Sequence, residues 1–483
     1  MMRLAALLTT IALLAALSCV PVMAQDAPAA PAGPDASAAP EAPTTPSAPA
    51  IDVVAFLKPY ADAPQASHDA LKKAADLIAL GKWKSAFESL DDFDKANVDP
   101  FALAMKTTLM LQGAIRTDMH RSFGLVDLEA GQDLESLRNS EGTYEPIAFD
   151  PSALADAQAA AGVAAPGILS KVLGDYFYDV LGRFSGQWAL SDDDIMAKVV
   201  DNYSKAYDAG VYDGASLLKY AESLVKSNRG DESDAVYRKA IRLDMKNANI
   251  RYSYAMGLTY RGKKAESLVE TDKAIEYYGE APEKINAIAL GARTAAELGD
   301  GDKTQAYYAI ADKDYPGSPT PGLLRHMVSI ESGDDAAAES AAEGLVAAFG
   351  SNPSVIRGLI SSWYSAGQVE AARDFLVKSI VTGGDDMTVG NLNFYLAVLI
   401  SQNPPTDEDK ETALKALDEA EAHFKTALGP DSEVFSVIAQ VRESLQPQAP
   451  DASASGEAGA PAPDGASPDA AAPDAPTPDS AGN

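Results

Sequence analysis

The chain repeats one short motif at intervals of 34 residues: Lys205-Ala206-Tyr207, Lys239-Ala240-Ile241 and Lys273-Ala274-Ile275. Four further pairs of positions keep the same register: Tyr203 and Tyr237, Ser233 and Ser267, Ala221 and Ala255, Leu224 and Leu258. Asn228 and Gly262 also correspond, and both residue types tolerate a left-handed turn conformation. A fixed period of this size predicts a stack of structural repeats.

Helical patterns continue on both sides of this region. Apolar residues from Leu71 to Leu80 share one helical stripe, and a break at Gly81 separates it from a second helix at Trp83–Phe93. Towards the other end, Thr406 and Asp409 form the pattern of a capping box, which predicts a helix to about Leu428. We expect Ser432–Leu445 to form a closing helix. No convincing run of alternating β-branched residues interrupts the pattern.

One segment departs from it. Asp118–Ala165 contains several glycines, Pro146 and an Ala/Gly run, with only short helical pieces. An irregular insertion of this length is functional or disordered, and the sequence leaves both alternatives open.

The helix pairs resemble tetratricopeptide (TPR) repeats, which consist of two antiparallel helices in about 34 residues. The first helix of such a repeat carries a small residue where its partner crosses, here Ala74, Ala221, Ala255 and Ala292. Turn residues separate the helices at Gly81, Asn228, Gly262, Gly299 and Gly367. The second helix carries an aromatic residue followed by a small one, here Tyr203/Ala206, Tyr237/Ala240, Tyr308/Ala311 and Phe424/Ala427.

The resemblance implies an all-α fold, a right-handed superhelical solenoid of antiparallel helix pairs over residues 51–446. It is clearest over residues 194–316. The register also fails at identifiable places: Thr271 replaces an aromatic residue, and His326 replaces a small one. A three-residue slip lies near Ala281-Pro282-Glu283.

Composition limits the function. The 483 residues carry a formal net charge of −31, so nucleic acid and anionic membrane surfaces are poor partners. The single cysteine, Cys19, lies near the N-terminus. We therefore expect no disulfide and no cysteine-dependent chemistry in the folded region.

Both ends of the chain differ from the middle. Residues 1–24 have a positive start, an apolar stretch and a small-residue cleavage site, which predict an export signal. Residues 25–50 and the acidic residues 447–483 are rich in alanine and proline, so we expect a disordered linker and a disordered tail. The mature protein would be periplasmic. Alternatively, Ala16-Leu17-Ser18-Cys19 resembles a lipobox, and a lipid on Cys19 would anchor the protein to the envelope.

The chain lacks the motifs of common enzymes. None of the four histidines has metal-site spacing, and there is no phosphate-binding loop or nucleophile elbow. Ser191-Asp192-Asp193-Asp194 is better interpreted as a helix N-cap than as part of a calcium loop. We therefore expect no catalysis, no cofactor and no metal.

In TPR proteins, partners bind on the concave face, which is lined by the first helices. That resemblance points to these residues: Tyr252, Met256, Thr259, Tyr260, Asn286, Arg293, Glu297, Arg357, Ser361 and Tyr364. The lysine and asparagine set of the family's chaperone-tail clamp is not evident, since Lys219 and Lys226 stand alone. The predicted function is a non-enzymatic scaffold of the cell envelope that binds a protein segment. The alternative is a solute-binding accessory of an uptake system, with a pocket closed by residues 118–165 and lined by Tyr252, Tyr260 and Arg293.

Overall fold

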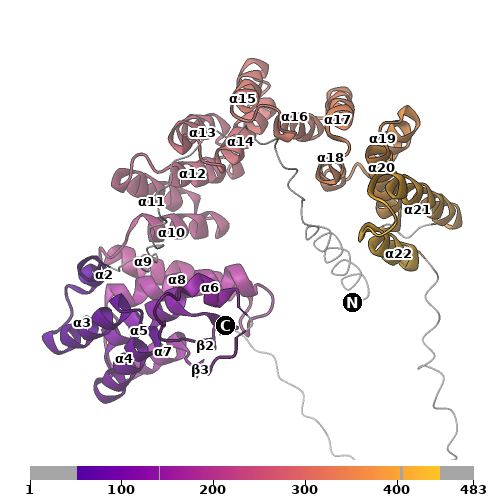
Figure 1. The fold of residues 1–483 in the computed structure, drawn as a ribbon. Coiled ribbons are helices and arrows are strands. Elements are labelled where there is room, and N and C mark those ends of the chain that lie inside the picture. The colour runs from indigo at the N-terminus through magenta and orange to yellow at the C-terminus, as the bar shows by residue number, and fades with distance from the viewer. Residues whose placement is uncertain (1–51, 141, 403–405, 446–483) are drawn as a thin grey trace, which may run out of the picture. The chain divides into compact units, whose positions relative to one another are not determined.

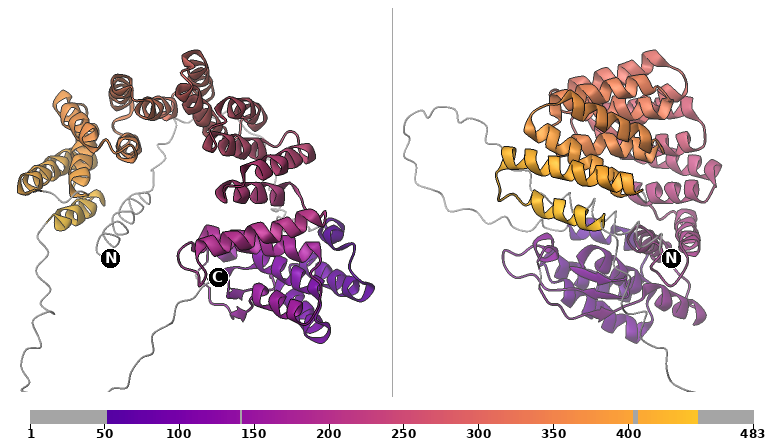
Figure 2. Two further views of the ribbon diagram at one scale, coloured as in Figure 1. Left: turned by 180° about the vertical axis from the view of Figure 1, so that it is seen from behind. Right: turned by 90° about the vertical axis from the view of Figure 1, so that its right-hand side faces the viewer.

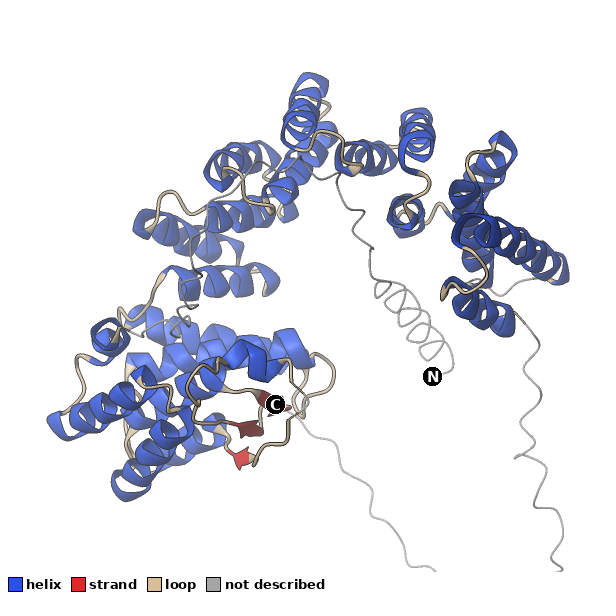
Figure 3. Ribbon diagram, viewed as in Figure 1, coloured by secondary structure: helices blue, strands red, loops and turns tan. Residues whose placement is uncertain are grey.

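The computed structural model describes residues 52–140, 142–402 and 406–445. The predicted signal, linker, tail and lipidation site at Cys19 lie outside the described residues. The described chain is helical almost throughout (Figure 3) and divides into two compact units. Unit 1 comprises the described residues up to 348 together with 358–368, and unit 2 comprises 349–357 and the described residues from 369 onward.

Unit 1 opens with a short segment that precedes the first helix pair. This segment consists of helix α2 (Val53–Leu57) and the 3-10 helix η2 (Lys58–Tyr60). Three longer helices follow: α3 (Gln65–Ala79), α4 (Trp83–Asn97) and α5 (Pro100–Gly113). Leu71, Ala74 and Ile78 of α3 are buried, so this part of the predicted apolar stripe faces the core. The prediction is wrong for Leu80, which lies at the C-cap of α3 and is 68% exposed.

The insertion predicted as irregular includes a small antiparallel sheet and two helices among its described residues, which exclude residue 141. Its elements are β1 (Arg116–Asp118), β2 (Ser122–Gly124), α6 (Leu134–Arg138), β3 (Ile147–Ala148) and α7 (Pro151–Ala160). These strands were not predicted, because strands of two or three residues are too short to show alternation. The backbone amide of Leu128 donates to the carbonyl of Gly81 at 2.9 Å, which fastens the insertion to the turn between α3 and α4.

The rest of unit 1 consists mainly of successive helix pairs (Figure 1). Four pairs are α8 (Gly167–Phe184) with α9 (Asp192–Asp208), α10 (Gly214–Lys226) with α11 (Gly230–Leu243), α12 (Ala248–Tyr260) with α13 (Lys264–Tyr278), and α14 (Lys284–Glu297) with α15 (Gly301–Asp314). The fifth is α16 (Thr320–Ser332) with α17 (Asp335–Phe349), where Gly322 lies against Leu345. This arrangement confirms the predicted all-α array of antiparallel helix pairs. Ser191 is the N-cap of α9, as predicted, because its side-chain oxygen accepts a hydrogen bond from the backbone amide of Asp194.

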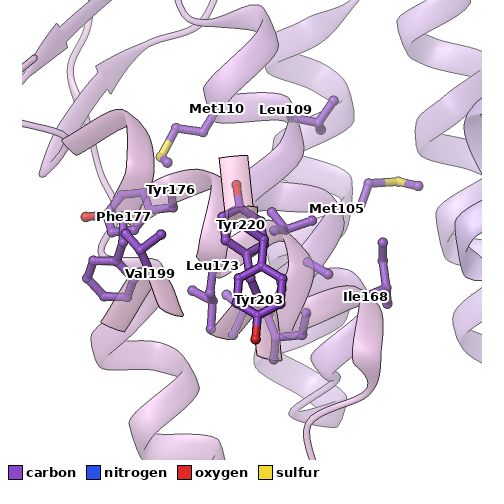
Figure 4. Close-up of a cluster of buried hydrophobic side chains, with 14 of the residues drawn as sticks. Met105, Leu109, Met110, Ile168, Leu173, Tyr176, Phe177, Val199, Tyr203 and Tyr220 are labelled. Atoms are coloured by element: carbon purple, nitrogen blue, oxygen red, sulfur yellow. The ribbon is translucent and has the colours of Figure 1, made fainter. Parts of the chain in front are cut away.

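The paired helices approach closely where the first helix carries a small residue. Ala74, Ala221, Ala255 and Ala292 are fully buried, as the register predicts. Glycine serves the same purpose in α8, where a side chain on Gly174 would lie 2.7 Å from the ring of Tyr203. Tyr203 lies in the buried cluster shown in Figure 4, near Leu173 and Tyr220. In α14, Gly291 leaves room for the ring of Tyr307 in the same way.

The predicted turn residues adopt the conformation that the register requires. Gly81, Asn228, Gly262, Gly299 and Gly367 all have φ between 58° and 75°. Asn228 is one of the few residues other than glycine with a positive φ, and asparagine tolerates this region better than most. The slip near Pro282 is accommodated by a longer α13 and by the connection that follows it, where Gly279 also has a positive φ.

His326 marks the predicted break in the register at α16. Its ring is fully buried, with Nδ1 3.0 Å from the carbonyl oxygen of Ala338 and Nε2 3.3 Å from that of Leu359. The indole of Trp363 packs edge-on at a centroid distance of 4.3 Å. A histidine therefore replaces the small residue by filling the space between neighbouring helices, and burial lowers its pKa.

Unit 2 contains the remaining helices. They are α19 (Val369–Thr382), α20 (Asp386–Ser401), α21 (Asp407–Leu428) and α22 (Val434–Ser444), while α18 (Pro353–Ser365) has residues in both units. Gly390 of α20 admits the ring of Phe424, and Thr406 with Asp409 forms the predicted capping box. The prediction that Ala427 is the small residue accompanying Phe424 is wrong, because Ala427 is exposed and Ala420 is buried instead. The views in Figure 2 show α20 to α22 in yellow and orange, and α20 is buried around most of its circumference.

Two glycines of α8 provide a test of the close approach. Gly174→Ala should lower the free energy of unfolding by about 1–3 kcal/mol, because the added methyl meets the ring of Tyr203. Gly182→Ala, whose methyl would meet nothing within 4 Å, should raise it by about 0.5–1 kcal/mol through better helix propensity. Urea denaturation measures both. Equal effects of the two substitutions would contradict the account.

A second prediction concerns the buried hydroxyl of Thr271. Its side chain is fully buried and its hydroxyl has no hydrogen-bond partner. Thr271→Val should raise the free energy of unfolding by about 1 kcal/mol, because the unpaired hydroxyl is removed without a change of shape. Thr107 is an equally buried control whose hydroxyl donates to the Leu103 carbonyl at 2.8 Å, and Thr107→Val should not stabilise. The free energies of unfolding of the two variants, measured by urea denaturation, test this prediction. A Thr271→Val variant no more stable than the wild-type protein would contradict it.

Candidate functional site: the first-helix face of unit 1

The first helices of unit 1 present two rows of side chains in a common register, which we call the first-helix face. One row directly follows the position that holds a small residue in α8, α10, α12 and α14 and His326 in α16: Asp175, Glu222, Met256, Arg293 and Met327. The other row lies four residues later, one helical turn away: Asp179, Lys226, Tyr260, Glu297 and Glu331. Four of the residues that the sequence predicts to bind a partner lie in these rows: Met256 and Tyr260 on α12, and Arg293 and Glu297 on α14.

Exposed apolar side chains lie in the middle of the face, on α12. The side chain of Tyr260 is 79% exposed and that of Met256 is 47% exposed. Tyr252 is half-buried, and its ring centroid lies 6.5 Å from that of Tyr278. An aromatic and a methionine side chain that are open to solvent on a helical face are typical of protein-binding surfaces.

The residues of α14 add charge to the face. Arg293 donates from Nε to Oε2 of Glu331 at 2.6 Å and contacts the sulfur of Met327 at 3.7 Å. Glu297 pairs with Lys264 at 3.0 Å, and Asn286 is exposed. The predicted residues Arg293 and Glu297 therefore lie near the surface but are already paired within the protein.

The remaining predicted residues are not all part of this face. The hydroxyl of Thr259 lies 2.7 Å from that of Ser267 and 3.5 Å from that of Thr294, so it links α12, α13 and α14 internally. Ser361 and Tyr364 are exposed on the part of α18 that belongs to unit 1. Arg357 is also on α18, in the part of that helix that belongs to unit 2.

A pocket of about 410 Å³ lies at the α8 end of the face. Its walls come from the N-terminal segment and from α5, α8, α10 and the connection before α10. The lining residues are Ala55, Phe56, Pro59, Tyr60, Thr108, Leu111, Gln112, Ile168, Lys171, Val172, Asp175, Asp179, Asp213 and Lys219. This lining includes neither residues 118–165 nor Tyr252, Tyr260 or Arg293, so the pocket is not the one that the sequence led us to expect.

Paired charges form the polar side of this pocket. Lys171 Nζ lies 3.1 Å from carboxylate oxygens of both Asp175 and Asp213. Lys219 Nζ and the hydroxyl of Tyr203 both donate to Oδ1 of Asp175 at 2.8 Å. Lys219 is therefore held in an ion pair with a residue of another helix.

The protonation of these groups follows from burial and pairing. Burial opposes the positive charge of Lys171, but the carboxylates of Asp175 and Asp213 outweigh it and raise the pKa of Lys171. Burial would raise the pKa of Asp213, but Lys171 outweighs it and lowers that pKa. Burial and the charge of Asp175 raise the pKa of Tyr203. At neutral pH Lys171 is thus charged, Asp213 is ionised and the hydroxyl of Tyr203 is neutral.

The insertion reaches this region through His120. The imidazole Nε2 lies 2.6 Å from Oδ2 of Asp179, and Nδ1 lies 2.9 Å from the hydroxyl of Thr117. His120 has a φ of 52°, and its ring is buried between Phe123, Tyr176 and Phe184. The His120–Asp179 contact therefore fixes the β1–β2 turn against α8.

Sequence reasoning missed both polar groups. Lys171 and Asp175 stand four residues apart on one helix, a spacing that indicates an ion pair and could have been noticed. His120 and Asp179 are separated by 59 residues, and no local pattern indicates that they meet.

No family model and no curated protein matches this sequence. Among solved structures, a TPR protein from Parabacteroides merdae is 14% identical, with 57% of this chain and 98% of that chain covered and a TM-score of 0.31. PilW, a type IV pilus biogenesis factor, is 19% identical over 47% of this chain and 98% of its own, with a TM-score of 0.24. Yeast Tom70 is 13% identical over 81% of this chain and 84% of its own, with a TM-score of 0.35. None of these likenesses bears on function.

In the described part of the chain, no helix has both the length and the apolar character needed to cross a bilayer.

The contact between His120 and Asp179 predicts a dependence of stability on pH. Burial alone would raise the pKa of Asp179, but the hydrogen bond with His120 and the charge of Arg183 outweigh it and lower the pKa. A carboxylate with a lowered pKa stabilises the fold above its unfolded pKa and loses this effect as the pH falls. Asp179→Asn should therefore lower the free energy of unfolding by about 1–2 kcal/mol at pH 7, and the difference should shrink below about pH 4.

Urea denaturation followed by tryptophan fluorescence measures this effect, since one of the three tryptophans, Trp188, has its ring centroid 6.3 Å from that of Phe184, beside His120. Asp201→Asn is the control, because Asp201 forms only an exposed pair with Lys205 and should change stability by less than about 0.5 kcal/mol. A loss for Asp179→Asn that is as large at pH 3 as at pH 7 would contradict the assignment.

Proposed function

We propose that this protein is a non-enzymatic interaction scaffold of the bacterial cell envelope and binds a segment of a partner protein along the first-helix face. The observation that carries the proposal is the exposure of Tyr260 and Met256 on a face whose positions are in register over five helices. Exposed apolar side chains that gather on one face among polar residues mark sites of protein interaction. The charged residues of the face on either side of Tyr260 and Met256 would set the orientation of the bound segment.

The pairing of charges on the face supports a protein partner rather than a strongly charged ligand. Arg293 and Glu331 neutralise one another, as do Lys264 and Glu297. Binding would then depend on apolar contacts with Tyr260 and Met256, with exchange of ion pairs at the rim.

The location of the protein is also a proposal. An export signal in residues 1–24 would deliver it to the periplasm, and a lipid on Cys19 would instead anchor it to the envelope. Cys19 is the single cysteine of the sequence, so the fold would need no disulfide either in the periplasm or at an envelope anchor.

A second candidate function is the binding of a small solute, as an accessory to uptake. The pocket of about 410 Å³ at the α8 end favours it, because that volume is within the range of small-molecule sites. The partner-binding function is preferred, because the charges in the pocket are already paired with one another.

The binding face is tested by substituting Tyr260, Met256 and Arg293 with alanine. The triple variant should lose at least about 90% of the partner that the wild-type protein recovers from envelope extract, since aromatic and arginine side chains dominate such interfaces. Quantitative mass spectrometry of the recovered proteins is the measurement.

Two exposed apolar residues away from the face provide the matched control. Val269 is on the second helix α13, and Met245 precedes α12; both are more than half exposed. A variant with alanine at these two positions should keep its partners. If it loses them while the triple variant retains them, the binding face is elsewhere.

A further inference from the structure

Residues 52–63, which we call the strap, contribute one wall of the pocket at the α8 end of the first-helix face. The strap contains α2, η2 and the turn that leads to α3. No residue of α2 is fully buried, and Val54 is 80% exposed. Phe56 and Leu57 are partly buried against the core of unit 1, and Tyr60, at 3% exposed, is the one buried residue of the strap.

The strap is held by few polar contacts. Within the described chain, one side-chain hydrogen bond joins it to the rest of the unit: the hydroxyl of Tyr60 lies 3.3 Å from Oγ1 of Thr108. This distance is long for a bond between two hydroxyl groups. Asp52 accepts from the amides of Val54 and Ala55, so its carboxylate is used within the strap itself.

The strap also packs incompletely on the helices beneath it. Ala55, Phe56, Pro59 and Tyr60 form one wall of the pocket, and residues of α5, α8 and α10 form the others. A space of about 410 Å³ therefore lies between these four residues and the helices that form the other walls. The atoms that face this space lack close neighbours and forfeit dispersion energy that a packed contact would provide.

We propose that the strap is a detachable cover, which releases locally while the helix pairs remain folded. Segments with few buried apolar contacts open at a lower free energy than the core to which they are attached. Release would expose Ile168 and Val172, both buried on α8 and both in the lining of the pocket. These residues are on the same helix as Asp175 and Asp179, so the first-helix face would be extended by an apolar surface.

The strap also indicates what this surface accepts. The strap packs Phe56, Leu57 and Tyr60 against the core of unit 1, next to α5 and α8. A short segment with neighbouring aromatic and aliphatic residues therefore fits this site. A partner segment of the same chemistry would replace the strap. This last step rests on the proposed function, whereas the release of the strap does not.

Two valines of α8 allow a direct test of release. Val172 lines the pocket beneath the strap and is 4% exposed, and Val180 is fully buried in the core. Each is replaced by cysteine in a full-length chain in which Cys19, the only native cysteine, is serine. A maleimide on a polyethylene glycol chain too large for the closed pocket then reports whether the strap has moved.

Val172→Cys should react at least about ten times faster than Val180→Cys without denaturant, because its exposure needs only local opening. Adding Tyr60→Ala should raise the rate at Val172→Cys further and leave the rate at Val180→Cys unchanged. Phe56→Ala, which removes a partly buried side chain, is the milder variant to be used if Tyr60→Ala disturbs folding.

Two results would overturn the proposal. One is equal reaction rates at both cysteines that rise together with urea, since exposure would then need global unfolding. The other is fast reaction at Val172→Cys that neither strap variant changes. Partner access is measured separately, as an increase in recovered partner with Phe56→Ala; no increase there, with release confirmed, would contradict only the step that rests on the proposed function.

Discussion

The close approach of two helices within each pair is the constraint on which the structure depends. Gly174 admits Tyr203, Gly291 admits Tyr307 and Gly390 admits Phe424, while buried alanines serve elsewhere. A ring on the second helix then fills the space that the missing side chain leaves on the first. The hydroxyl of Tyr203 reaches Asp175 and that of Tyr307 reaches Asp272, so these rings also orient carboxylates at the surface.

The same constraint creates the first-helix face. Because the small residue of each first helix must face its partner, the residue that follows it turns away from the pair. Successive pairs therefore place Glu222, Met256 and Arg293 in one row, whatever their chemistry. The repeat specifies the positions of these side chains, and the individual sequence of each helix determines what they can bind.

Much of the fold could be predicted from the sequence because its signals are local. The interval of 34 residues, the left-handed turn at Asn228 and the capping box at Thr406 each depend on neighbouring residues, and all three are confirmed. The pocket could not be predicted, because it requires α2, α5, α8 and α10 to converge. His120 and Asp179 meet across 59 residues through a hairpin whose strands are too short to recognise. On α12, exposure of Tyr260 and Met256 agrees with the predicted face, whereas Thr259 is used internally.

The central claim, that partners bind the first-helix face, is tested most directly by site-specific photocrosslinking in living cells. A photoreactive phenylalanine analogue is placed at Tyr260, and in a second strain at Val269, an exposed position on the second helix of the same pair. Crosslinking from position 260 to a discrete partner, with none from position 269, is the result that the account predicts. A partner captured from position 269 and not from position 260 would contradict it.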